Sequence, residues 1–185
     1  CKLGAKAKEL SIPLLHESED AGNRIAMPEA THYHQSAGFF PGRSAEYSED
    51  VRMRLELGGK TTAVDYLRAC EQRVQFIHRL LGRMDETGVD VLAVPTTPIA
   101  APRIGEEKIL LAGKEYPIRA LLLRPNRPAN LAGVPAISVP CGFAPAGLPI
   151  GLQLIGRHTA ESELLRIAHA FERMQSETRA QSPKL

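Results

Sequence analysis

Residues 127–142 read RPANLAGVPAISVPCG, and residues 147–156 read GLPIGLQLIG. Prolines bracket the short apolar run Pro135–Pro140, which is typical of a buried strand. A turn rich in proline and glycine, Ala144–Gly147, separates it from a second apolar run, Pro149–Gly156. Two strands joined by so short a turn pair in antiparallel fashion. This stretch therefore predicts the centre of a sheet.

The sequence before this pair predicts a long helix, a third buried strand and a hairpin. Residues 62–87 carry one apolar stripe at helical spacing, and Gly88 is a suitable stop. Residues 89–95 are apolar and β-branched, which favours a buried strand. Residues 109–118 form a small hairpin pattern around Gly113. The stripe of the long helix consists of Cys70, Val74, Ile77, Leu81 and Met84.

Four shorter patterns complete the outline. Residues 10–15 predict a short strand or an extended segment, and residues 23–37 and 48–57 predict helices. Thr159 is the expected N-cap of a last helix. The inward-facing side chains expected in the second and last of these helices are Val51, Leu55 and Leu57, and then Leu164, Ile167, Ala168, Phe171 and Met174. The fold class that follows is α/β, a mixed sheet covered by helices and lacking some of its neighbouring strands.

Composition excludes several classes of protein. The 185 residues are 43% hydrophobic and 24% charged, which is typical of a globular chain. A net charge of +2 gives no basic surface for nucleic acid or for an anionic membrane. The longest uncharged stretch, 128–156, contains five prolines and is not a membrane-spanning helix. No secretory signal is visible at the start, so we expect a cytoplasmic protein.

Metal, cofactor and disulfide patterns are absent from the sequence. Cys1, Cys70 and Cys141 fit neither a disulfide framework nor a zinc motif. His32 and His34 point in different directions on a helix, and no carboxylate cluster accompanies them. The glycines match neither a dinucleotide fingerprint nor a phosphate-binding loop. We therefore expect no metal and no cofactor.

No self-contained catalytic group emerges from the residues alone. A serine nucleophile needs an oriented base beside it, and the sequence has no Gly-x-Ser-x-Gly elbow. Ser138 lies in the predicted strand between Ile137 and Val139, where a satisfied interior hydroxyl is the expected state. We therefore expect no catalytic residue in this chain.

The stretch 127–142 closely resembles the C-terminal block of the amidase signature family, in which an Asn-Leu-x-Gly-x-Pro turn leads into Ala-Ile-Ser-x-Pro-x-Gly. Residues 147–156 and the helix carrying Glu161 are similar to its continuation. The strand ending in Pro95-Thr96 resembles the family's Asp-x-Leu-x-x-Pro-Thr strand. The likeness covers nearly the whole chain, and its other segments are Glu29-Ala30 with His32, Asp50–Leu55 with Gly58, Asp65–Ala69 with Arg73, and Pro98 with Ala101-Pro102.

Members of this family cleave amide or ester bonds with a Ser–Ser–Lys triad. The resemblance places the triad and the oxyanion hole in the N-terminal half of such enzymes. Neither is in this chain. The expected organisation is therefore that residues 1–185 form the C-terminal portion of one amidase domain, with a disordered tail after about residue 176.

The resemblance also implies four substrate-binding candidates, which are Arg54, Leu123, Asn126 and Asn130. Asn130 either contacts substrate or caps the backbone of its own turn. Arg54 either binds a substrate carboxylate, as in some relatives, or forms a surface salt bridge. Glutamine-using relatives place an Asp at the position of Leu123, and a leucine does not pair with an ammonium group.

Three functions remain open from the sequence. The first is a hydrolase acting on a small linear amide, with the N-terminal half of the same enzyme as its partner and a homodimer as an open option. The second is the A subunit of a glutamine-dependent tRNA amidotransferase, which Leu123 disfavours. The third is a non-catalytic domain that binds a ligand or a partner. Arg124 and Arg127 would suit an acidic substrate, although solvent exposure is the default for both.

Overall fold

The computed structural model describes residues 4–12 and 17–175. The expected N-terminal extended segment lies partly outside these ranges, and the expected tail lies wholly outside them. The elements are, in chain order, α1 (Glu17–Ser36), the 3₁₀ helix η2 (Ser44–Glu46), α2 (Glu49–Gly58), α3 (Ala63–Thr87), β1 (Leu92–Pro95), β2 (Lys108–Leu111), β3 (Lys114–Pro117), α4 (Ile118–Leu123), α5 (Arg127–Ala132), β4 (Ala136–Phe143), β5 (Pro149–Ile155) and α6 (Glu161–Met174). The predicted α/β class is confirmed.

The main sheet contains β1, β5 and β4 in that order. The predicted antiparallel pairing of the two apolar runs is confirmed, with Ser138 opposite Gln153. β1 pairs with the other side of β5, also in antiparallel fashion. All the pairings in the part of the chain that the structure describes are antiparallel, so no parallel neighbour of the expected mixed sheet lies among them.

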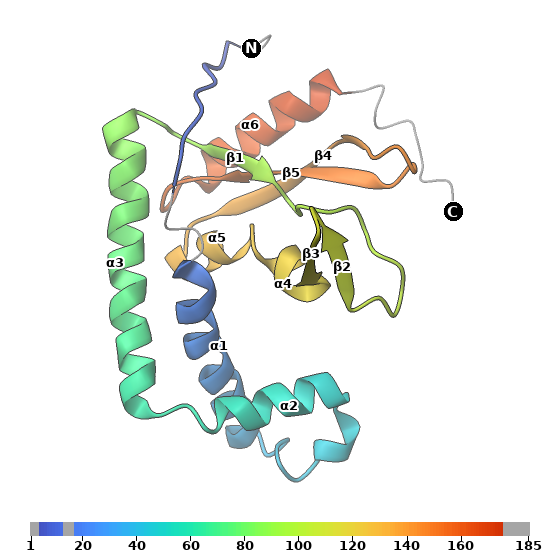
Figure 1. Ribbon diagram of the computed structural model, residues 1–185. Helices are drawn as coiled ribbons and strands as arrows, with labels where there is room; N and C mark the ends of the chain where they lie inside the picture. Colours follow the sequence, from blue (N-terminus) through green and yellow to red (C-terminus); the bar gives the residue numbers. More distant parts are fainter. Residues whose placement is uncertain (1–3, 13–16, 176–185) are drawn as a thin grey trace.

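Helices lie on both faces of this sheet. Figure 1 shows α6 above it and the short helices α4 and α5 below it. The face toward α6 is apolar, because Val139 and Leu154 pack against Leu164 and Ala168. At the opposite face Leu92 and Ile155 join a larger core with α1, α3 and α5. The sheet thus has its own cover on one side and a helical scaffold on the other.

The helix α3 is the longest element and is well delimited. The Thr62 hydroxyl accepts a hydrogen bond from the Asp65 amide at 3.1 Å and caps its start. Gly88 ends it in the left-handed region, as predicted. The buried stripe differs from the expected one, because its centre is Ala69, Phe76, Leu80 and Met84. Cys70, Ile77 and Leu81 only flank that core, and Val74 is 54% exposed.

The helices α1 and α2 pack across each other at the end of α1 farthest from the sheet (Figure 1). A side chain at Gly58 would overlap Thr31 and the Met27 carbonyl, so the crossing needs glycine there. Leu55 is buried at this crossing as expected. The same expectation was wrong for Val51 and Leu57, which are 37% and 45% exposed.

Three expectations near helix ends differ from the structure, and the segment at residues 10–12 is not a strand. The first helix begins at Glu17 rather than near residue 23, and it continues through Pro28. Thr159 is not the N-cap of α6, because it has a φ of 62° and Ala160 takes that position. Met174, expected inward, is exposed. Residues 10–12 form no strand, although Leu10 and Ile12 pack against the core.

The segment before β4 is helical rather than a simple turn. Pro128 occupies the first turn of α5, where a missing amide proton has no cost, and Gly133 closes the helix in the left-handed region. A second short helix, α4, precedes it. Both helices escape a sequence-based prediction, because six residues are too few to show a helical period. Together they form the junction that carries three of the four expected substrate residues.

Candidate functional site

A group of polar side chains gathers below the sheet, at the end of β1. The backbone amide of Thr96 donates to the Gly151 carbonyl at 2.8 Å and extends the pairing of β1 with β5. The Thr96 hydroxyl lies 2.5 Å from that of Ser138, which is on β4. Residues from three strands therefore converge at one point on this face.

Two amide side chains fasten the α4–α5 junction to the same point. Asn126 donates from Nδ2 to the carbonyls of Thr96 at 3.3 Å and Leu122 at 3.1 Å. Gln153 is 4% exposed and donates from Nε2 to the Pro125 carbonyl at 2.9 Å. The junction is thus held to β1 by one amide and to β5 by the other.

Gly151 makes room for the hydroxyl pair. A Cβ atom at this position would lie 2.6 Å from Thr96 Oγ1 and 2.8 Å from Ser138 Oγ. Real Cβ contacts are not that short, so any side chain would push the two hydroxyls apart. Its neighbour across the sheet, Pro140, is exposed. The absence of a side chain at Gly151 therefore lets the two hydroxyls lie next to each other on this face.

Ser138 is exposed, and the expectation of an interior hydroxyl was wrong. Its strand β4 is at the edge of the sheet. The alternate residues Ala136, Ser138 and Pro140 of this strand, which share the face opposite α6, are all exposed. Within residues 4–12 and 17–175, its hydroxyl bonds only to Thr96, which is not a base. This geometry gives Ser138 a positioning contact and no means of activation as a nucleophile.

Three of the four expected substrate residues lie along one junction. Leu123 ends α4 and is partly buried, and Asn126 immediately precedes α5. Asn130 is exposed on α5, and its side chain makes no hydrogen bond to the described residues. The capping alternative for Asn130 was wrong, because backbone bonds of the helix and of Gly133 satisfy the turn.

The fourth expected residue, Arg54, lies apart from the other three. It is on α2, at the far end of α1 from the junction (Figure 1). It forms an ion pair with Asp50 one turn earlier on the same helix. The structure therefore brings Leu123, Asn126 and Asn130 together, and it does not bring Arg54 to them.

Sequence reasoning missed Thr96, Gln153 and Gly151 as members of this group. Thr96 had a signal, because a polar residue directly after a buried strand often lies at a site. Gln153 had one too, because it is the one amide within the apolar run 149–156. Gly151 had no such signal. Glycine is required there only because the side chains of two residues distant in the sequence pack against it.

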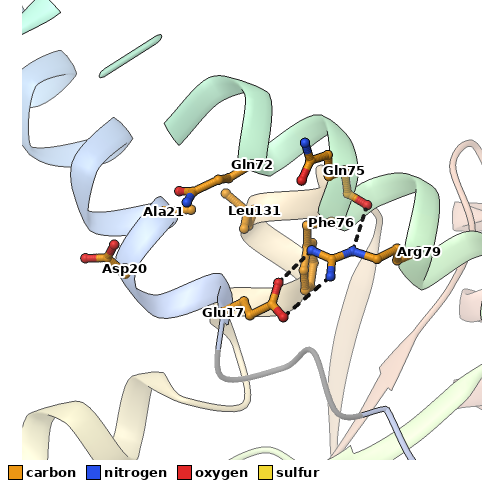
Figure 2. A pocket seen from close by; sticks show the side chains of 8 residues that line it. All are labelled: Glu17, Asp20, Ala21, Gln72, Gln75, Phe76, Arg79 and Leu131. Carbon is orange, nitrogen blue, oxygen red and sulfur yellow. Dashed lines mark hydrogen bonds and ion pairs between the residues drawn. The ribbon is translucent and has the colours of Figure 1, made fainter. Parts of the chain in front are cut away.

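A separate pocket of about 410 Å³ lies between α1 and α3. Figure 2 shows Arg79 reaching across Phe76 to Glu17, and their ion pair measures 2.6 Å from Nη2 to Oε2. Gln72 and Gln75 line the pocket from α3, and Asp20 and Ala21 line it from α1. Leu131 from α5 completes the lining. The charge of Arg79 is thus already balanced within the pocket.

The rest of the described residues offers one strongly shifted pKa and neither a metal-binding group nor a membrane-spanning helix. Tyr66 donates to Glu29 at 2.9 Å, and this bond to a carboxylate raises the pKa of Tyr66 to about 12. Among residues 4–12 and 17–175, no group of three or more His, Cys, Asp and Glu side chains is placed to hold a metal ion. No helix in these ranges combines the length and apolar character needed to cross a bilayer.

A profile of the amidase family matches residues 1–165. The chain belongs to the amidase family. The match covers the elements that build the polar group below the sheet, from the strand that precedes Thr96 through β5. A solved structure described as an amidase superimposes with a TM-score of 0.84 at 28% identity, over 94% of this chain and 38% of that one.

Curated relatives point to two branches of the family. Fatty acid amide hydrolase of Oryza sativa subsp. indica is 35% identical over 92% of this chain. A glutamyl-tRNA(Gln) amidotransferase subunit of Geobacillus thermodenitrificans is 36% identical over 92% of it. The chain spans only 28% of the rice protein and 38% of the bacterial one. Most of each relative therefore has no counterpart in these residues.

Proposed function

We propose that the complete protein hydrolyses the carbon–nitrogen bond of a small linear amide, and that this chain is the C-terminal portion of that enzyme. Membership of the amidase family supports the reaction type. The observation that carries the role of this portion is the open polar face below the sheet. There Asn126 and the Thr96–Ser138 pair are held in fixed positions beside the exposed Asn130.

This face has the properties of one wall of a substrate site. Sites for small molecules combine apolar lining with a few fixed polar groups. Leu123, which ends α4 three residues before Asn126, would supply an apolar side chain. Asn126 is held through both of its amide hydrogens. Its carbonyl oxygen makes no hydrogen bond to the described residues and is free to accept from the N–H of a bound amide. A wall of this kind orients a substrate without reacting with it.

The reactive groups are proposed to lie in the rest of the protein. Ser138 has no base beside it within the described ranges, so we assign it no nucleophilic role. The family's Ser–Ser–Lys triad would face this wall from the N-terminal portion. The isolated chain is therefore expected to be inactive, and the exposed edge of β4 is expected to make it marginally stable. We propose a cytoplasmic location, with Cys70 and Cys141 kept as free thiols.

A second candidate is glutamine-dependent transamidation. The 36% identity to a glutamyl-tRNA(Gln) amidotransferase subunit favours it. Leu123 disfavours it, because a leucine at the junction offers nothing to pair with the ammonium group of glutamine. A third reading, a domain that only binds a ligand or partner, predicts no turnover in any form of the protein.

The test is ammonia release by the complete natural protein that contains this chain. Hexanamide, benzamide and glutamine would be offered in parallel, and Ser138→Ala would test whether that hydroxyl is a nucleophile. We expect hydrolysis of at least one simple amide and little hydrolysis of glutamine. Turnover by Ser138→Ala should fall by no more than about tenfold, the loss of one ordinary hydrogen bond in the wall, and not by the far larger factor that loss of a nucleophile would cause. Release of ammonia from glutamine alone would favour the transamidation reading, and no release from any amide would favour the binding reading.

A further inference from the structure

The helix α5 is held in place by contacts from outside, because it is too short to be stable by itself. It has six residues, and a helix of that length does not persist in water without packing. At its start, Arg127 donates from Nη1 to Asn23 Oδ1 at 2.7 Å and to the Glu19 carbonyl at 3.3 Å. Both acceptors lie on α1, so the start of α5 is tied to the helical scaffold.

The other end of α5 is tied to the scaffold by Arg73. This residue lies on α3 and donates from Nε to the Leu131 carbonyl at 2.8 Å. Its Nη2 lies 3.4 Å from the position that a Cβ atom on Gly133 would take, so the guanidinium extends along the turn that closes the helix. Among the described residues, the Arg73 side chain makes no other hydrogen bond. Its truncation would therefore remove one hydrogen bond, at the end of α5.

The Leu131 carbonyl needs a donor from outside the helix. The last carbonyls of a helix have no intrahelical partner, and arginine side chains are among the groups that bind them. In α5 the closing turn uses the carbonyls of Ala129 and Asn130, which accept from the Gly133 amide. The carbonyl of Leu131 accepts from Arg73 instead. Arg73 thus satisfies the acceptor that the closing turn leaves over.

The part of α3 that carries Arg73 is firmly packed. Ala69 and Phe76, one turn before and after it, are 0% and 1% exposed and belong to the main core. Residues three and four apart lie on one side of a helix, so the Arg73 side chain starts next to this packed side. Leu131 belongs to the same core and is 6% exposed. The contact from Arg73 to α5 therefore starts from a fixed position.

Asn130 connects this contact to the proposed substrate wall. It directly precedes Leu131 on α5, and it is exposed. We infer that Arg73 is a positioning residue, which fixes the end of α5 through the Leu131 carbonyl and thereby sets the place of the Asn130 side chain in the wall. This inference rests on the proposed amide hydrolysis and adds a residue of α3 to it. Arg73 acts through Asn130 and does not itself meet the substrate.

The first test measures KM and kcat of the complete protein for a simple amide that it hydrolyses. Arg73→Met removes the donor and keeps a good helix former. We expect KM to rise at least about fivefold, the equivalent of one ordinary hydrogen bond, while kcat changes less than about twofold. The matched control is Arg83→Met, because the Arg83 guanidinium pairs with Glu86 of the same helix. That variant should leave both constants unchanged.

Two further variants separate position from charge and from folding. Arg73→Lys keeps the charge and has no donor at the place of Nε, so it should restore only part of the loss. Asn130→Ala removes the side chain through which Arg73 acts, and it should itself raise KM. When Arg73→Met is added to Asn130→Ala, KM should stay within about twofold of the single Asn130 variant. A merely structural role of Arg73 would lower the unfolding midpoint and raise KM by the same factor in both backgrounds.

Hydrogen exchange reports on the end of α5 without requiring activity. The amides of Gly133 and Val134 close the helix by donating to the Ala129 carbonyl. In Arg73→Met of the complete protein, we expect these two amides to exchange at least about fivefold faster, because loss of an outside contact favours local opening. In Arg83→Met their exchange should be unchanged.

The outcomes distinguish this inference from the function on which it rests. An unchanged KM in Arg73→Met, or effects that multiply in the combined variant, would overturn the inference while amide hydrolysis stands. Unchanged exchange at Gly133 and Val134 would also overturn it, whether or not the protein is active. Faster exchange in a protein that hydrolyses no amide would overturn the proposed function and confirm that Arg73 holds α5.

Discussion

The two faces of the main sheet differ in what meets them. Toward α6, Val139 and Leu154 are almost fully buried against Leu164 and Ala168. On the opposite face, Ser138 is open, although it lies next to Val139 on the same strand. Strand alternation alone separates these two neighbours, because successive side chains point to opposite faces. The chain covers one face with its own helix and leaves part of the other polar.

This difference separates the residues that stabilise the fold from those that are proposed to contact the substrate. The α6 face is a closed core of apolar side chains. The open part of the opposite face is held by hydrogen bonds of Thr96, Ser138, Asn126 and Gln153, and each of these fixes one strand or the α4–α5 junction. Substitutions on the α6 face should therefore change stability alone, while those on the polar face should change catalysis as well.

The largest effect is expected from Leu164→Ala on the α6 face. Leu164 is 2% exposed, and truncation of a buried leucine lowers the free energy of unfolding by about 2–5 kcal/mol. Denaturant unfolding of the complete protein measures the loss. The matched control is Leu165→Ala, since that leucine is 59% exposed and should cost less than about 1 kcal/mol. A change in KM below the unfolding range in Leu164→Ala would break the division between the faces.

Gly151→Ala should combine a moderate loss of stability with a larger loss of activity. The added methyl would displace the Thr96 and Ser138 hydroxyls, and such overpacking costs about 1–3 kcal/mol. Because the hydroxyls belong to the proposed wall, kcat/KM for a simple amide should fall at least about tenfold, the equivalent of 1.4 kcal/mol. Parallel unfolding and kinetic measurements give both numbers.

Gly82→Ala is the matched control for this substitution. Gly82 lies within α3, and a Cβ there would meet no atom within 4 Å. Alanine should stabilise the helix by about 0.5–1 kcal/mol and leave kinetics unchanged. Unaltered activity in Gly151→Ala, with a loss of stability alone, would show that the hydroxyl pair is only structural.

Gln153→Leu is expected to have the smallest effect on stability of the three. It keeps the buried volume and removes the hydrogen bond to the Pro125 carbonyl, a loss of about 0.5–1.5 kcal/mol. Because Pro125 immediately precedes Asn126, the junction should shift and KM for a simple amide should rise. Kinetics well below the unfolding midpoint test this. An unchanged KM would mean that Asn126 holds the junction without help from Gln153.

Much of the fold is visible in the sequence, and the reason is periodicity. The strands β4 and β5 and their pairing follow from two apolar runs and one short turn. Long helices such as α3 also show their period, although the sequence placed its stripe toward Val74 rather than Phe76. That error arose because apolar residues cover more than one side of α3, and tertiary packing selects among them.

The site is only partly visible in the sequence. Leu123, Asn126 and Asn130 follow from the resemblance to the amidase family, and the structure shows them along one junction. The Thr96–Ser138 pair and the Gln153 bond join residues at least 28 positions apart, and no local pattern records such contacts. The bonds of Arg127 to the Glu19 carbonyl and to Asn23 likewise join residues 108 and 104 positions apart.

The most direct test of the central claim is a crystal structure of the complete protein with a bound ketone analogue of hexanamide. The account predicts ligand atoms within about 4 Å of Leu123, Asn126 or Asn130, on the face of the sheet opposite α6. A ligand bound elsewhere, with these three side chains covered by other parts of the protein, would contradict it.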